Sequence, residues 1–186
     1  MKKLLIAVSF LSLLFSAQAD MKIGTVDLML LIRNHPSYDS NKELLKSTDK
    51  DYQKKLEAIK GEGDKLQEEG KKLVEQMQNP MLAAKAKGDL EKQIAEIQKQ
   101  LMSIEQRYRS EAMRCRQDLS DLEGRLLKTT TDDLKKRIKA YAEKEGYDFI
   151  VDRSVTPYAK EVFDVSDAIL SAMGVDLKKV KTDESK

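Results

Sequence analysis

The sequence predicts an α+β fold that is mainly α, in which a long antiparallel, coiled-coil-like helical hairpin projects from a small β-rich oligomerisation body. Three observations support this prediction. Apolar residues recur at alternating spacings of four and three through the first half of the chain, as in a helix packed against another helix. A second long helical segment follows a turn. Short strand patterns lie only near the two ends of the chain.

Residues 1–19 have the composition of a secretory signal peptide. Two lysines follow the starting methionine, residues 4–15 are apolar, and Ala17-Gln18-Ala19 supplies the small residues of a cleavage site. Cleavage is expected between Ala19 and Asp20. A membrane anchor is the alternative, but the apolar run is shorter than the roughly 20 residues that span a bilayer.

The mature chain is formally neutral. The 34 basic residues of the full chain include Lys2 and Lys3 of the signal, so cleavage leaves 32 of them against 32 acidic residues. A protein that binds nucleic acid through its phosphates needs an excess of positive charge, so no nucleic acid is expected as a partner. With 35% charged and 5% aromatic residues, the composition suits long solvated helices better than a large globular core.

The first long helix is predicted from about Ser40 to Gln78. Gly63 and Gly70 fall within its seam, where each costs roughly 1 kcal/mol relative to alanine. They indicate a weak seam, a close approach of two backbones or flexibility, and two such losses one heptad apart favour flexibility. The seam consists of Leu45, Asp49, Tyr52, Leu56, Ile59, Gly63, Leu66, Gly70, Leu73 and Met77.

Asn79 and Pro80 mark the turn of the hairpin. Asparagine is a strong N-cap and proline is favoured at the first helical position, so the second helix is predicted to begin there. Its seam shifts by one residue after Tyr108, a stutter that locally unwinds a supercoil. The helix is predicted to end near Gly146. The seam consists of Leu82, Ala86, Leu90, Ile94, Ile97, Leu101, Ile104, Tyr108, Ala112, Cys115, Leu119, Leu122 and Leu126.

Residues 20–39 and 146–175 are predicted to form the β-rich body, and residues 40–145 the hairpin. Strands are expected at 21–26 and 147–152, with a third at 158–163 antiparallel to the second. Asp27 caps a brief helix, and Asp164 begins a final helix that Gly174 ends. Residues 176–186 are predicted to be a flexible tail. Because so small a body has little core of its own, it is predicted to oligomerise.

No constellation of catalytic residues appears, so an enzyme is not expected, and no cofactor or metal is predicted. His35 is the only histidine and is expected on the surface at the end of a helix. Cys115, the only cysteine, is expected to be a small apolar residue of the seam, with an intermolecular disulfide left open. The glycines of the helical region lack the Gly-Lys-Ser/Thr sequence of a phosphate loop.

The order of these features resembles the Skp/OmpH family of periplasmic chaperones. The resemblance rests on the signal, Lys22 to Asp27, the hairpin, Tyr147 to Asp152 and Asp164 to Leu170. It implies a homotrimer in the periplasm, whose helical tentacles surround a cavity for unfolded outer-membrane β-barrel proteins without use of ATP. It further implies a tentacle tip at 71–100. The trimer body would be built by Ile23, Val26, Phe149, Val151 and Val162.

Two functions follow from this sequence. The first is an ATP-independent holdase chaperone, and the alternative is a structural coiled-coil scaffold of the cell envelope that binds a folded partner. The best-known family members are strongly basic, whereas the basic runs here are interpreted as solvated helix faces balanced by nearby acids. A peripheral contact with a membrane stays open. Apolar residues outside the seam are the candidate client contacts, since methionine adapts to varied partners. They are Leu44, Met81, Met102 and Met113, whereas Val74 is assigned to the hairpin core.

Overall fold

The computed structural model describes residues 21–180. The predicted signal peptide, its cleavage site at Ala19 and Asp20, and the last part of the predicted tail lie outside the described residues. The chain divides into two compact units. The hairpin unit comprises residues 35–133, and the end unit combines the residues before His35 with those after Asp133.

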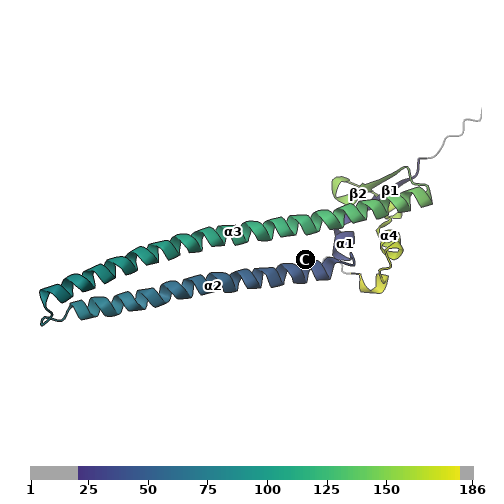
Figure 1. The fold of residues 1–186 in the computed structure, drawn as a ribbon. Coiled ribbons are helices and arrows are strands. Elements are labelled where there is room, and N and C mark those ends of the chain that lie inside the picture. Colours follow the sequence, from purple (N-terminus) through teal and green to yellow (C-terminus); the bar gives the residue numbers. More distant parts are fainter. Residues whose placement is uncertain (1–20, 181–186) are drawn as a thin grey trace, which may run out of the picture. The chain divides into compact units, whose positions relative to one another are not determined.

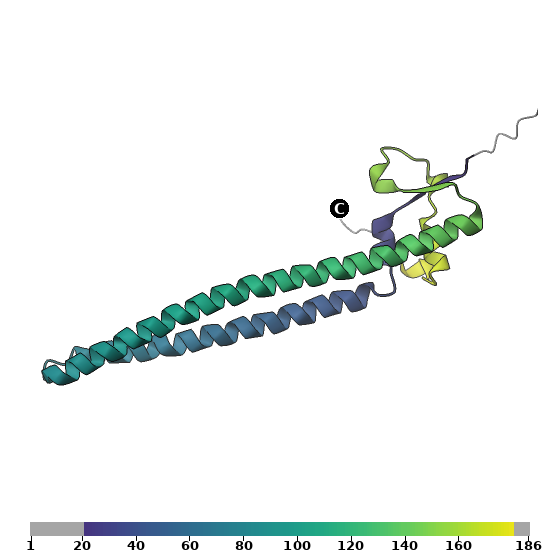
Figure 2. The same ribbon diagram turned by 45° about the horizontal axis from the view of Figure 1, so that its top comes forward.

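Two long helices form the hairpin unit. Helix α2 spans Tyr38–Met77 and helix α3 spans Ala84–Glu145, of which the part from Leu134 onward belongs to the end unit. The two helices lie side by side in Figure 1 and again in Figure 2, which confirms the predicted hairpin. Every predicted seam position of α2 is buried or half-buried, whereas most side chains between them are exposed. The hairpin is therefore held by one narrow apolar stripe.

The start of the second helix was predicted wrongly. Helix α3 begins at Ala84, and residues 79–82 form a β-turn in which the Leu82 amide donates to the Asn79 carbonyl at 3.2 Å. The Asn79 side chain caps this turn instead of a helix, because its Oδ1 accepts from the Met81 amide at 3.0 Å. Asparagine at the first position and proline at the second are favourable in a turn of this kind. Asn79 and Pro80 therefore stabilise a turn and do not start a helix.

Gly63 and Gly70 lie opposite isoleucines of α3. A Cβ on Gly63 would stand 3.5 Å from the Ile104 Cγ2, and a Cβ on Gly70 would stand 3.3 Å from the Ile97 Cγ2. The missing side chains leave holes that two large side chains fill, as in knobs-into-holes packing. The structure therefore favours the close approach of the helices over the flexibility that the sequence suggested.

The core of the end unit gathers residues from both ends of the chain. Helix α1 spans Leu28–Arg33 and helix α4 spans Ser166–Ala172. Four side chains that are almost inaccessible to solvent form its centre, and Val26 and Val165 join them. The four are Leu31 from α1, Leu134 from α3, and Ile169 and Leu170 from α4.

The helices of the end unit begin and end largely as predicted. The Asp27 Oδ1 accepts from the Leu30 amide at 2.8 Å, which caps α1. Helix α3 ends just before Gly146, and α4 ends two residues before Gly174. These glycines have φ of 70° and 79°, a left-handed conformation that glycine adopts without strain and that commonly ends helices.

A parallel pair of strands makes up the sheet of the end unit. Strand β1 spans Ile23–Val26 and strand β2 spans Phe149–Asp152, with Ile23 opposite Phe149. The predicted antiparallel strand at 158–163 is wrong. A 3₁₀ helix at Arg153–Val155, capped by the Asp152 side chain, turns the chain out of β2 before a strand can return beside it. The chain instead meets β1 through a single parallel bridge between Thr25 and Asp164.

The first part of the predicted flexible tail, residues 176–180, is folded. Leu177–Lys179 form a 3₁₀ helix, in which the Asp176 Oδ1 accepts from the Lys178 amide at 3.1 Å. Val180 then packs against the core of the end unit. The prediction failed because it weighed the polar composition of the segment and overlooked its last apolar residue.

The seam glycines generate a graded prediction. Gly63→Ala should stabilise the hairpin by about 0.5–1 kcal/mol, because alanine lowers the entropy cost of the helix and its methyl makes an ordinary contact with Ile104. Gly70→Ala should stabilise less, since its methyl would press on Ile97 at 3.3 Å. Urea unfolding followed by circular dichroism, at one fixed protein concentration, measures both changes.

Gly61→Ala is the matched control, because its Cβ would meet nothing within 4 Å in the same helix. It should stabilise about as much as Gly63→Ala. A clear loss of stability for Gly63→Ala alone would contradict the ordinary contact with Ile104 described above, because it would mean that the seam has no room for a methyl group at this position.

Candidate functional site

The four predicted contact residues of the hairpin are all exposed. Leu44 is 46% exposed, Met81 91%, Met102 71% and Met113 69%. They do not form one cluster in the sequence, since Leu44 lies on α2, Met81 in the turn and the other two on α3. Val74, assigned by the sequence to the hairpin core, is also exposed. The hairpin thus presents apolar side chains at several points along its length.

Met102 and Met113 share one face of α3. They line a shallow surface pocket together with Glu105, Gln106 and Arg109. The two thioethers are flexible and polarisable, and such side chains adapt to irregular apolar partners. This face can therefore make apolar contacts that demand no fixed partner shape.

The strand surface of the end unit carries most of the predicted trimer residues. Ile23, Phe149 and Val151 are exposed on the strands, where the first two are paired in the register. Val162 is also exposed but lies in a 3₁₀ helix at Glu161–Phe163. Val26 is an exception, because it is only 3% exposed and lies in the core of its own chain. Val26 therefore supports this surface from beneath and does not reach it.

The exposed apolar surface of the end unit is larger than the sequence indicated. Val155, Tyr158 and Phe163 are exposed as well, and the sequence analysis proposed none of them as a contact. Large exposed apolar patches are typical of sites that another molecule covers, and these three side chains add to the exposed apolar residues of the end unit. The signal available in the sequence was the concentration of apolar residues between Val155 and Phe163.

Ion pairs balance the arginine-rich part of α3. Arg107 pairs with Glu62 of α2, and Arg109 pairs with Glu105 one turn away. The hydrogen bond between Lys55 and Glu111, also across the helices, lowers the pKa of Glu111 and raises the pKa of Lys55. Exposed pairs of this kind stabilise a helix little. Their main effect is to reduce the positive field of this segment.

Cys115 is buried in the seam, as expected of a small apolar residue. It is 5% exposed, and its thiol faces the Glu111 carboxylate, with 3.8 Å between Sγ and Oε1. Burial, and then the nearby negative charge of Glu111, raise the pKa of the thiol. The side chain is consequently a poor nucleophile at neutral pH.

His35 does not lie on the surface as predicted. Its Nε2 stands 3.0 Å from the Asp133 Oδ2 and its Nδ1 stands 2.8 Å from the Ser37 Oγ. The histidine side chain is only 10% exposed. It thus connects the segment before α2 to α3. Among the residues that the structure describes, no group of three or more acidic, histidine or cysteine side chains could hold a metal.

Comparison with known proteins accounts for this arrangement. The sequence model of the family described as outer membrane protein (OmpH-like) matches residues 22–173, which include β1, the whole hairpin, β2 and α4. The chain belongs to the OmpH-like family. A search of curated proteins found no match.

OmpH-like membership implies a Skp-like chaperone and places the chain in a family without catalytic activity. The family also suggests the periplasm and the binding of outer-membrane proteins. Within residues 21–180, no helix combines the length and the apolar character needed to cross a bilayer.

The buried thiol of this OmpH-like chain gives a test of the seam. Cys115 should react with a thiol reagent far more slowly in the folded protein than in urea, because its pKa is raised and its sulfur is covered. The difference in reaction rate should persist above about pH 8.5, the pKa of an unperturbed thiol. The rate of reaction with dithionitrobenzoate, with and without urea, measures it. Equal rates in both conditions would contradict the seam position of Cys115.

Proposed function

We propose that the protein is an ATP-independent holdase chaperone of the periplasm, which binds unfolded outer-membrane β-barrel proteins in a cavity between the helical tentacles of a homotrimer. The observation that supports this function most directly is the OmpH-like family match across residues 22–173. The match covers both the hairpin and the strand-bearing ends.

The hairpin offers a physical means of holding an unfolded chain. Unfolded β-barrel proteins expose apolar side chains and unpaired strand edges that aggregate with one another. Exposed Leu44, Met81, Met102 and Met113 can contact such segments one at a time. Contacts that are weak and spread along two helices hold a client without fixing its conformation, so release needs no hydrolysis of ATP.

The exposed strand surface supports a trimer. Ile23, Phe149 and Val151 leave an apolar sheet face uncovered in the single chain, and burial of such a face against other copies is favourable at about 25 cal/mol per Å². Residues 20–39 and 146–175 would supply the trimer body, and the segment 71–100 would form the tip of each tentacle.

Removal of residues 71–100 tests the tentacle model. A urea-unfolded outer-membrane β-barrel protein is diluted into buffer without ATP, and light scattering records its aggregation. The mature chain should suppress aggregation at a near-stoichiometric ratio of trimer to client. The shortened variant should lose this protection and remain a trimer, because the exposed strand surface lies outside the deleted segment.

The scaffold of the cell envelope is the rival function that this assay separates. A scaffold that binds one folded partner would leave aggregation unchanged even as the intact chain. Full protection by the shortened variant would instead reject the tentacle tip as a necessary part of a holdase.

Phe149→Asp tests the trimer. A carboxylate on the apolar sheet face should lower the molecular mass from trimer toward monomer, because burial of an unpaired charge is costly. Sedimentation equilibrium measures the mass, and circular dichroism checks that the helix content is kept. Met29→Asp is the matched control, since Met29 is 53% exposed against 55% for Phe149 but lies on α1. A monomeric unmodified chain, or dissociation by Met29→Asp alone, would contradict the proposed interface.

A further inference from the structure

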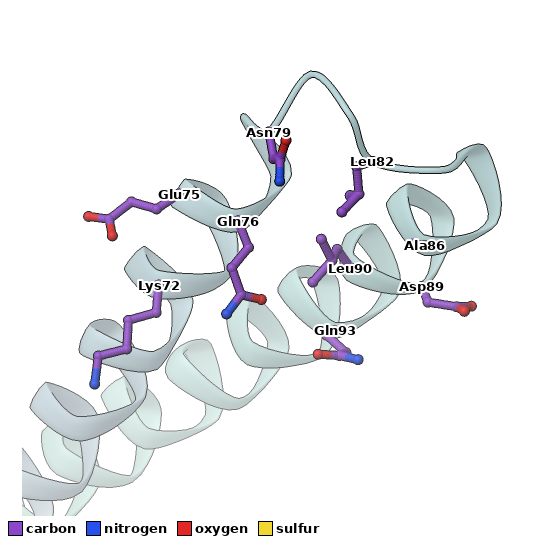
Figure 3. A pocket seen from close by; sticks show the side chains of 9 residues that line it. All are labelled: Lys72, Glu75, Gln76, Asn79, Leu82, Ala86, Asp89, Leu90 and Gln93. Carbon is purple, nitrogen blue, oxygen red and sulfur yellow. The ribbon is translucent and has the colours of Figure 1, made fainter.

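The tip of the hairpin unit contains a cavity between α2 and α3 that is open to solvent (Figure 3), with a volume of about 790 Å³ and with exposed polar side chains in its lining. Three of its lining side chains are charged: Lys72, Glu75 and Asp89. The other six lining residues are neutral and comprise three carboxamides and three apolar residues. These are Gln76, Asn79 and Gln93, and Leu82, Ala86 and Leu90.

The cavity results from the local sequence of the turn and the seam. Helix α3 starts only at Ala84, so the chain between the helices has room to spread at the tip. Ala86 then places a single methyl group at a seam position, whereas the neighbouring seam positions Leu82 and Leu90 carry leucine. Leu82 and Leu90 point toward each other in Figure 3 and form the apolar part of the lining.

The carboxamides of this cavity are exposed to solvent, so a ligand can take the place of water as their hydrogen-bond partner. Within the described chain, neither the Gln76 nor the Gln93 carboxamide makes a side-chain hydrogen bond. The Asn79 Oδ1 accepts from the Met81 amide, which leaves its nitrogen able to donate. Each carboxamide has the same donor and acceptor groups as a peptide bond.

The charges of the cavity restrict what it can bind. One lysine and two carboxylates give no positive excess, so a phosphate or another anion finds no complementary field. The lining instead pairs amide groups with an apolar wall. An extended polypeptide has the matching chemistry, since its backbone N–H and C=O groups repeat about every 3.3 Å and its side chains alternate.

We propose that the tip cavity binds an extended segment of an unfolded polypeptide, with Gln76 and Gln93 hydrogen-bonded to its backbone and an apolar side chain against Leu82 and Leu90. The proposal rests on the holdase function and specifies where and how the client is bound. Recognition through the backbone is independent of client sequence. It complements the apolar contacts of the exposed methionines, which require client side chains.

The double variant Gln76→Met and Gln93→Met tests the proposal. Methionine keeps the length and the helix propensity of glutamine, removes the hydrogen bonds and adds apolar surface. The dissociation constant for a urea-unfolded outer-membrane β-barrel protein should rise about tenfold, as expected for the loss of two hydrogen bonds. A cavity that works only by apolar contact would bind tighter after this change.

Gln98→Met is the matched control, because Gln98 is exposed on the same helix and does not line the cavity. It should leave the dissociation constant unchanged. An unchanged or lower constant for the double variant overturns the cavity proposal and leaves the holdase function standing. Absence of client binding by the unmodified chain overturns both, and the two failures are thereby distinguished.

Crosslinking provides a second test that does not depend on the stability of the double variant. A benzophenone-maleimide is attached to Gln93→Cys or to Gln98→Cys, each in a chain with Cys115→Ser. Irradiation should join the client to position 93 far more than to position 98. Equal yields at both positions, or crosslinks between copies of the chaperone at position 93, would overturn the proposal.

Discussion

A narrow seam between α2 and α3 is the constraint on which the hairpin unit depends. Only Ile59, Ile97 and Cys115 of that unit are buried apolar side chains. The remaining seam residues are half-covered, except that Tyr108, predicted in the seam of the second helix, is exposed. Because so little apolar area is removed from water, the stability of the hairpin depends more on close packing than on the size of the side chains in the seam. Gly63 and Gly70 let Ile104 and Ile97 approach the α2 backbone, which compensates for the narrow stripe. The surface outside the seam is thereby left free for other contacts.

The long elements could be predicted from the sequence because each has a strong periodic signal. The seam from Leu45 to Met77 fixed which face of α2 is covered, and the glycines Gly146 and Gly174 follow the ends of α3 and α4. Short segments could not be predicted as well, because a few local interactions decide them. At Asn79, turn hydrogen bonds form where the sequence predicted the start of a helix. At Arg153–Val155, a 3₁₀ helix forms where the sequence predicted the turn of an antiparallel strand pair.

The exposure of the candidate contact residues could be predicted from the sequence, whereas the burial of Val26 and His35 could not. Leu44, Met81, Met102 and Met113 are exposed as the seam pattern implies, because an apolar residue outside the seam of a two-helix hairpin has no partner in the unit. Val26 and His35 show the opposite limit. Both are covered by residues distant in the sequence, Val26 in the core and His35 beside Asp133. The tip cavity was also beyond prediction, since it depends on where α3 starts.

Parallel pairing of β1 with β2 has a consequence for the order of folding. The Lys22 amide donates to the Asp148 Oδ2 across 126 residues of sequence, and Leu31 is buried with Leu134 and Leu170. Because the chain is made from its N-terminus, β1 and α1 emerge long before their partners exist. The end unit can fold only when almost the whole chain is present in one compartment, whereas the hairpin, whose contacts are more local, can form earlier. An incomplete chain therefore lacks the finished strand surface on which the proposed trimer would depend.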